Sequence, residues 1–450
     1  MIFAGYLLVL TLTLLHPIEA FAPVLAVYRP VLLLSLIVLA AAGFTAARSG
    51  RIAAAPRHLA LFGAFIAALA LSRVFNGWTG GAIVALTEFG PTAVLFATTL
   101  LIVTTVQRLK LTCATIAVCM TLLAVAGIAA VHTGFMADQL LVHEGVEVND
   151  HLDPEAEANA DPDAAPDDDA QRTLWRVRSW GFLSDPNDFS QAMVATLPMF
   201  AAIWLRRRRL RNLAIVWIPG ALLLYAIYLT HSRGALLGLA AVVAFALLRR
   251  AGYMRTAILL GAMAAGAVFV GFTGGRSYSS EEESAGGRIE AWSEGIQMLR
   301  SEPIFGVGYG NFTDNFEYTA HNSFVLCFAE LGLVGYFVWL AMLVLSLKET
   351  RIASTEAPAE GDEARWSRTL RLSMIGFLVC AWFLSRTYQP VLFLLVALCI
   401  ATSYCAHRAA APEASGWPAP PRWPATTAKV MIASIIVIYI VVRLQNVLVR

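Results

Sequence analysis

A histidine, an arginine and a glycine-rich stretch stand close together in this chain, between two hydrophobic runs. They are Arg288 with Trp292, the stretch 303–312, and the pair His321 and Asn322. A guanidinium group can donate two parallel hydrogen bonds, which makes it a preferred partner of phosphate. An imidazole titrates near neutral pH and can take the proton of a hydroxyl group. The combination indicates chemistry on an anionic substrate, placed where a hydrophobic segment meets water.

Two other stretches bring cations to the ends of hydrophobic runs. Arg176 and Arg178 lie among the aromatic residues of 175–182, and Arg233 follows His231 between two runs. Arginine and tryptophan at such positions often only anchor a protein at the membrane interface. They can equally form a cationic wall that faces an anionic lipid head group. Both interpretations stay open from these residues alone.

Four more ionisable residues lie inside or beside hydrophobic runs. Glu330 lies within the run that begins at the histidine, and Glu88 lies within another. An ionisable side chain inside a membrane is a functional candidate by default, although Glu330 could instead be the structural partner of an arginine. His16 and Glu19 stand at the end of a run and are expected at the membrane interface.

The composition defines the class of protein that carries these residues. Hydrophobic residues make up 58% of the 450 residues and charged residues only 14%, against about 45–50% and about 25% in soluble proteins. Apolar runs of about 20 residues can cross a bilayer as helices. The predicted fold is an all-α, polytopic integral membrane protein of about 12–13 transmembrane helices. The predicted spans are 2–18, 30–47, 58–75, 82–106, 111–131, 189–205, 213–230, 234–248, 255–273, 322–347, 370–386, 388–406 and 429–447.

The distribution of Lys and Arg predicts the orientation. Cytoplasmic loops of membrane proteins carry an excess of these residues close to the helix ends. A cytoplasmic N-terminus puts most of the basic residues inside, including the clusters at 206–211 and 249–255. Two long loops, 132–188 and 274–320, are then external.

The predicted spans and loops divide the chain into five segments. Transmembrane helices are expected in 1–131, 189–273 and 321–450, separated by the two external loops. The first loop contains an acidic insert, residues 144–169, whose Asp-, Ala- and Pro-rich composition cannot form a core. Its aspartates lack the ligand spacing of an EF-hand, so no metal site is predicted.

The second external loop has a more ordered pattern. Apolar residues at spacings of three and four predict a short amphipathic helix over 287–301, which ends before Pro303. The glycines at 306, 308 and 310 predict a tight turn that folds the loop back on the helix bundle.

The end of this loop resembles a known family. His321 and Asn322, then nine residues, Gly332, two residues and Gly335, are similar to the histidine motif of the O-antigen ligase and polymerase superfamily of bacterial membrane glycosyltransferases. In that family the motif opens a transmembrane helix just after a large external loop, as it does here.

Upstream residues extend the resemblance over roughly residues 175–347. The family loop carries an arginine, a tryptophan and a P-x-F-G-x-G-x-x-x-F pattern, similar to Arg288, Trp292 and 303–312. The Ser-Arg-Gly step at 232–234 is similar too. The acidic insert departs from typical members, which puts the choice of acceptor in doubt more than the chemistry.

The resemblance implies roles for individual residues. His321 would accept or orient the proton of an acceptor hydroxyl, and Arg288 and Arg233 would hold the diphosphate of an undecaprenyl-linked glycan. The residues expected to bind substrate around them are Arg176, Arg178, Trp292, Asn322 and Glu330.

The resemblance also implies a reaction and a place. The glycan would move from undecaprenyl diphosphate to an acceptor hydroxyl on lipid A core, another glycan or a protein, with inversion at the anomeric carbon. Because the lipid diphosphate is already a good leaving group, no nucleotide cofactor and no metal are expected. The protein would lie in the bilayer of the bacterial inner membrane, and both long loops would be periplasmic, with 274–320 as the catalytic loop.

Other functions remain open. A polymerase of O-antigen or exopolysaccharide would join lipid-linked repeat units instead of transferring a finished glycan. A transporter or flippase of such lipids would show paired halves or interrupted helices, and the sequence shows no such repeat. The six cysteines are expected as buried thiols. The net charge of +2 gives no basic face for a nucleic acid.

Overall fold

The computed structural model confirms an all-α polytopic membrane protein. It describes residues 1–48, 56–144, 174–204, 208–269, 278–356, 358, 361–410, 420 and 422–448. Among these residues, eight helices are long and apolar enough to cross a membrane, and two more apolar helices, Ile2–Leu15 and Arg233–Leu248, are shorter. The eight are Pro30–Arg48, Arg57–Phe75, Thr79–Ile102, Val106–Thr133, Arg209–Leu229, Ser323–Thr355, Pro390–Ala410 and Trp423–Gln445.

Each predicted span overlaps a helix. The N-terminal elements are α1 (Ile2–Leu15), α2 (Pro17–Phe21), α3 (Pro23–Ala26), α4 (Pro30–Arg48), α5 (Pro56–Phe75), α6 (Thr79–Ile102), α7 (Val106–Thr133) and α8 (Ala137–Leu140). The central ones are α10 (Pro186–Ile203), α11 (Arg209–Asn212), η3 (Leu213–Trp217), α12 (Ile218–Leu229) and α13 (Arg233–Phe269). The C-terminal ones are α14 (Tyr278–Ser301), α15 (Phe312–Asn315), α16 (Ser323–Glu356), α17 (Asp362–Ala381), α18 (Pro390–Ala410) and α19 (Trp423–Leu448).

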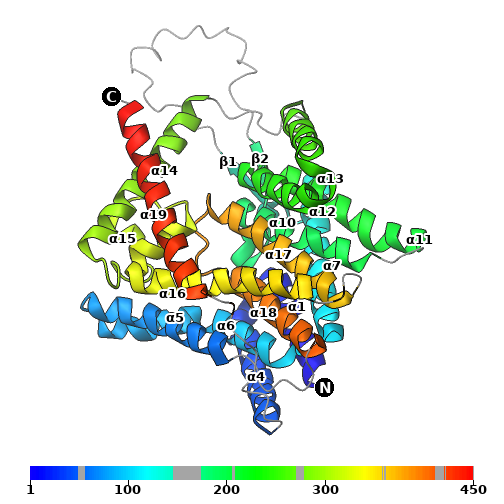
Figure 1. Cartoon of the computed structure of the whole chain (residues 1–450). Coiled ribbons are helices and arrows are strands. Elements are labelled where there is room, and N and C mark those ends of the chain that lie inside the picture. Colours follow the sequence, from blue (N-terminus) through cyan, green and yellow to red (C-terminus); the bar gives the residue numbers. More distant parts are fainter. Residues whose placement is uncertain are drawn as a thin grey trace.

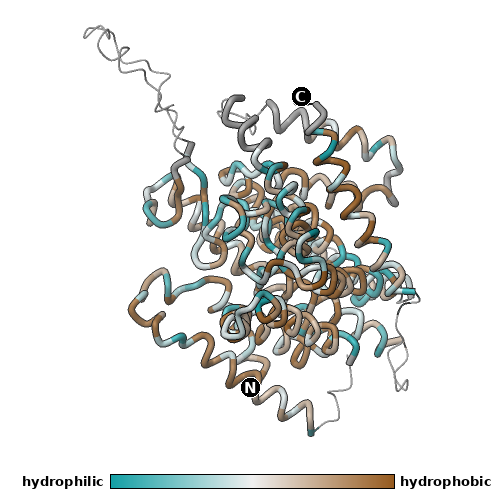
Figure 2. Tube along the Cα trace, turned by 90° about the vertical axis from the view of Figure 1, so that its left-hand side faces the viewer, coloured by the Kyte–Doolittle hydropathy of each residue, from teal (hydrophilic) through white to brown (hydrophobic). Residues whose placement is uncertain are grey.

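Helices α16 and α18 form the centre of the bundle. Helix α16 packs against α5, α14, α17, α18 and α19 (Figure 1), and its aromatic residues Phe328, Tyr336 and Trp339 are fully buried. The outer helices are apolar on their exposed sides as well. Leu33 and Ile37 of α4 are exposed, for example, and hydrophobic residues run along most of the helices in Figure 2. Helices that are apolar all round are expected where lipid replaces water.

A small β-hairpin was not predicted. Strands β1 (Leu141–Glu144) and β2 (Leu174–Val177) pair antiparallel, with Leu141 opposite Val177 and Glu144 opposite Leu174. The hairpin holds together the two ends of the acidic insert. The insert itself lies outside the described residues beyond Glu144, so the expectation that it forms no core is not tested by the structure.

Polar contacts gather at the two ends of the bundle. Residues predicted to be cytoplasmic meet at one end, where Lys110 pairs with Asp362 and Glu349 with His58 at 2.9 Å. Residues predicted to be external meet at the other end, which we call the site end. Contacts there include Arg73 with Asn311, Arg176 with Asn187, and Arg386 with Asp185.

The glycine-rich loop 303–311 docks into a break in α16. The backbone of Gly332 (φ 61°, ψ −166°) interrupts the helix within the span predicted at 322–347, a break that was not predicted. Backbone hydrogen bonds join loop and break in both directions: Val307 N to Ala329 O (2.9 Å), Gly308 N to Glu330 O (3.0 Å), Leu333 N to Pro303 O (2.8 Å) and Val334 N to Ile304 O (3.3 Å). The loop thus partners groups that the broken helix leaves open, as the apolar surroundings demand.

The end of α5 holds the same loop from its other side. The Nδ2 of Asn76 donates to the Gly306 carbonyl at 2.8 Å, and the Phe75 ring stacks on Phe305 with centroids 4.1 Å apart. Arg73 donates to the Asn311 side chain. The predicted fold-back of the glycine turn is therefore confirmed, and the loop is fixed on both faces.

We expect Gly332→Ala to destabilise the protein strongly. A Cβ at this position would lie 2.4 Å from the backbone carbon of Ile304, in a left-handed conformation that L-residues avoid. Strain of this kind costs about 1–3 kcal/mol, and the backbone contact adds to it. Thermal unfolding in detergent should show a clearly lowered midpoint. Gly63→Ala in α5, where a Cβ meets nothing within 4 Å, is the control; equal midpoints for the two variants would contradict the role of the break.

Candidate active site

His321 occupies a strained turn at the start of α16. Its backbone is left-handed, with φ 46°, a conformation that costs a non-glycine residue about 1–2 kcal/mol. The next residue, Asn322, is fully buried and caps the helix, because its Oδ1 accepts from the amides of Phe324 (2.8 Å) and Val325 (3.1 Å). Strain held in place by a buried cap is typical of functional positions.

Trp292 fixes the backbone just before the histidine. The indole Nε1 donates to the Ala320 carbonyl at 3.0 Å, and the ring lies edge-on to Trp382 with centroids 6.1 Å apart. Trp292 belongs to α14, which covers the predicted helix 287–301 and begins earlier, at Tyr278. The side chain predicted to bind substrate is thus buried behind the histidine and positions it.

The turn between α17 and α18 forms the opposite wall of the site. Ser323 ties it to α16, because its Oγ donates to the Leu384 carbonyl (2.6 Å) and accepts from the Arg386 amide (2.8 Å). Thr387 adds a hydrogen bond from its Oγ1 to the Ser323 carbonyl at 2.7 Å. The turn therefore moves as one unit with the residues next to His321.

This turn carries Arg386, a cation that sequence reasoning missed. Its guanidinium pairs with the buried Asp188 and, at 3.6 Å, with Asp185. Asp185 also caps α10, where its Oδ1 accepts from the Asn187 amide at 2.7 Å. One feature of the sequence could have identified Arg386. It lies at the external end of the predicted span 370–386, just before the next predicted span begins at 388.

The electrostatics of the site keep His321 neutral. Burial lowers the pKa of the imidazole most, the guanidinium groups of Arg288 and Arg386 lower it further, and Asp185 alone acts in the other direction. The pKa of His321 therefore lies below its usual value of about 6.5. At neutral pH the ring has a free lone pair, so it can accept a proton.

Two predicted cations lie at this same end. Arg288, on α14, is close enough to act on the charge of His321. Arg233 is exposed at the first position of α13. The start of α13 lies against the end of α17, where the Cys380 thiol donates to the Gly234 carbonyl at 3.4 Å. The structure thus brings His321 together with Arg288 and Arg386 and places Arg233 beside the α17 end.

The other two predicted arginines hold the first external loop. The buried Arg176 donates from Nε to the Thr230 carbonyl (2.9 Å) and from a terminal nitrogen to Asn187 Oδ1 (3.0 Å). Arg178 donates from Nε to the Gln139 carbonyl at 2.8 Å. Both guanidinium groups therefore connect β2 and the residue after it to neighbouring elements.

Glu330 lies below the site, inside the bundle. It is buried and accepts from the Phe312 amide (3.2 Å) and the Tyr388 hydroxyl (2.7 Å). It thus links the glycine-rich loop to the turn that carries Arg386. In these hydrogen bonds the partners of the carboxylate are a backbone amide and a tyrosine hydroxyl, and not an arginine. Glu330 is therefore a positioning residue for both walls of the site.

The remaining side chains give little support for a bound ion. Across the described ranges, no three His, Cys, Asp or Glu side chains gather as a metal site requires. The six cysteines are buried free thiols, as expected. The side chains that the structure brings together at the site are the His321 imidazole and the guanidinium groups of Arg288 and Arg386.

Comparison with known proteins agrees with this arrangement. A search of curated proteins finds no match. A family model described as O-antigen ligase matches residues 218–340, a segment that contains Arg233, Arg288 and His321. The matched segment is thus similar to the O-antigen ligase superfamily, whose function is of the ligase or polymerase type.

Proposed function

We propose that the protein transfers a glycan from undecaprenyl diphosphate to an acceptor hydroxyl at the outer face of the bacterial inner membrane. The observation that carries the proposal is a histidine kept neutral by burial and by the arginines beside it. A base that works near neutral pH needs such a state. The match to the O-antigen ligase family supports the same class of reaction.

His321 would act on the acceptor. Its imidazole takes the hydroxyl proton while the acceptor oxygen attacks the anomeric carbon of the donor sugar. The bond between that carbon and the phosphate oxygen breaks, and undecaprenyl diphosphate leaves with the bonding electrons. A single displacement of this kind inverts the configuration at the anomeric carbon, and a trapped covalent glycosyl-enzyme would contradict it.

The arginines would act on the donor. Charge builds on the diphosphate as the bond breaks, and fixed cations that face it stabilise the transition state. Arg288 and Arg233 suit this role, because each lies at the site end and Arg288 is close enough to act on the charge of His321. Arg386 is held by its ion pairs with Asp185 and Asp188, so it would position the wall of the site.

The acceptor decides the biological role. Transfer of a finished glycan to lipid A core or a related surface acceptor is the ligase reaction, and joining of lipid-linked repeat units is the polymerase reaction. The same histidine and arginines serve both. The acidic insert, which in the sequence lies between the paired strands β1 and β2, is a candidate determinant of the acceptor.

We expect His321→Ala to lower the rate of glycan transfer by about 10²–10⁴-fold, the usual contribution of a general base. Arg288→Ala should lower it by about 10²–10³-fold, as for the loss of one group that stabilises transition-state charge. The assay uses the protein reconstituted with an undecaprenyl-diphosphate glycan and a panel of hydroxyl acceptors.

Arg300→Ala is the matched control for this assay. Arg300 lies on the same helix as Arg288 but faces the Tyr439 ring, with 5.8 Å between its guanidinium carbon and the ring centroid, so the rate should stay near that of the unmodified protein. Equal product from His321→Ala and the unmodified protein would refute the mechanism. Lipid movement without transfer would favour the flippase.

The pH dependence of the transfer activity should depend on the charged groups next to His321. Activity of the unmodified protein should fall only as the pH drops below the lowered pKa of His321, since the protonated ring cannot accept a proton. Arg288→Gln removes a cation that disfavours the protonated ring. The pKa of His321 then rises, and the acid limb of kcat/KM moves to higher pH. An acid limb that stays in place in Arg288→Gln would show that another group controls the profile.

A further inference from the structure

A cavity lies between α1, α4 and α6, and Phe182 and Pro390 also line it. It has a volume of about 350 Å³. Its deeper walls are apolar and include Leu12 and Leu95, whereas polar residues gather where α1 ends and α4 begins. A cavity that is apolar along the helices and polar at the helix ends can accommodate both the acyl chain and the head group of a lipid.

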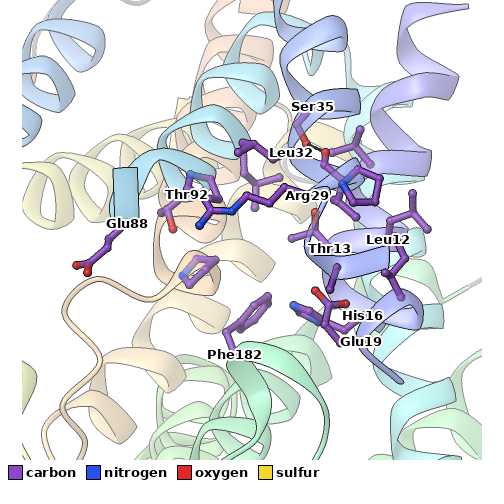
Figure 3. Close-up of a pocket in the computed structure, with 18 of the residues that line it drawn as sticks. Leu12, Thr13, His16, Glu19, Arg29, Leu32, Ser35, Glu88, Thr92 and Phe182 are labelled. Atoms are coloured by element: carbon purple, nitrogen blue, oxygen red, sulfur yellow. Dashed lines mark hydrogen bonds between the residues drawn. The ribbon is translucent and has the colours of Figure 1, made fainter. Parts of the chain in front are cut away.

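The polar end contains the ionisable residues that the proposed function leaves unused. Figure 3 shows His16 and Glu19 side by side next to Phe182, with Glu88 on the opposite side and Arg29 reaching between them toward Thr92. Arg29 has a left-handed backbone (φ 46°) and is exposed to the cavity. Within the part of the chain that the structure describes, its guanidinium has no ion-pair partner.

Residues 181 and 182 pack closely against His16 in the wall near the polar end of the cavity. A Cβ at Gly181 would lie 2.2 Å from the His16 ring, and the Phe182 ring lies edge-on to His16 with centroids 4.9 Å apart. The Phe182 carbonyl accepts from Gln389 Nε2 at 3.2 Å, and the same nitrogen contacts Asp188 at 3.2 Å. The cavity therefore shares this wall with the turn that carries Arg386.

The charges at the polar end select the kind of head group. One guanidinium, that of Arg29, and two carboxylates, those of Glu19 and Glu88, line this end of the cavity. A diphosphate would meet a net negative lining, whereas a head group with one phosphate and one ammonium group would find a partner for each charge. An anionic lipid without an amine would leave both carboxylates facing its phosphate.

We propose that this cavity binds a zwitterionic phospholipid of the phosphatidylethanolamine type. The phosphate lies against Arg29, the ammonium group against Glu19 or Glu88, and one acyl chain along Leu12 and Leu95. The site is separate from the proposed glycan transfer and does not depend on it. A bound lipid would support the Phe182 wall and, through Gln389, the turn next to His321.

Native mass spectrometry of the full protein, purified in detergent and titrated with defined lipids, tests the proposal. We expect phosphatidylethanolamine to be retained at least tenfold better than phosphatidylglycerol, and Arg29→Ala to abolish that preference. Arg48→Ala at the other end of α4, where the guanidinium lies 4.3 Å from the Phe44 ring centroid, should leave retention unchanged.

Two further variants separate loss of the site from loss of the fold. Glu19→Gln combined with Glu88→Gln should turn the preference toward phosphatidylglycerol, a gain that a misfolded protein cannot show. Leu12→Trp should fill the apolar part and lower the retention of both lipids. Equal retention of the two lipids by the unmodified protein, unchanged retention by Arg29→Ala, or stronger retention of undecaprenyl diphosphate at this site would overturn the proposal.

Discussion

The docking of the glycine-rich loop into the break of α16 is the constraint on which the site depends. A broken helix in the middle of an apolar bundle exposes backbone groups that lipid and apolar side chains cannot satisfy. Here the loop at 303–308 supplies the missing partners through hydrogen bonds of 2.8–3.3 Å. The exchange works only because Gly306 and Gly332 allow backbones to touch; a Cβ at either residue would lie 2.4 Å from the facing backbone. Helix and loop therefore form one rigid unit.

The position of the histidine follows from this unit. His321 lies at the start of the broken helix, Trp292 holds the carbonyl before it, and Glu330 joins the loop to the Tyr388 hydroxyl on the neighbouring turn. Burial then keeps the imidazole neutral and the nearby guanidinium groups reinforce the effect. A neutral base and an anion-binding group in one place are the two requirements of the glycan transfer that we propose, so the same packing that stabilises the fold positions the groups on which the proposal depends.

Much of this could be predicted from the sequence, for physical reasons. Spans appear as hydrophobic runs, and the histidine, Arg288 and the glycine turn stand in one stretch whose polarity contrasts with its surroundings. Arg386 was missed because it is distant in the sequence and borders a hydrophobic run, so only the packing of α17 against α10 brings it to Asp188. The break at Gly332 was missed because a helix break whose backbone groups are hydrogen-bonded does not change the hydropathy of the sequence. Arg176 and Trp292 support the structure through hydrogen bonds to the carbonyl groups of Thr230 and Ala320. No local sequence pattern predicts these partners.

The central claim is that His321 is a neutral base beside guanidinium groups. Nitrogen NMR of the reconstituted protein with ¹⁵N-labelled histidine measures this directly, with His321→Gln used to assign its signal among the eight histidines. The account predicts a neutral imidazole at pH 7 that becomes protonated only below the usual histidine pKa of about 6.5. A ring that is already protonated at pH 7, or that titrates above the usual value, would contradict it.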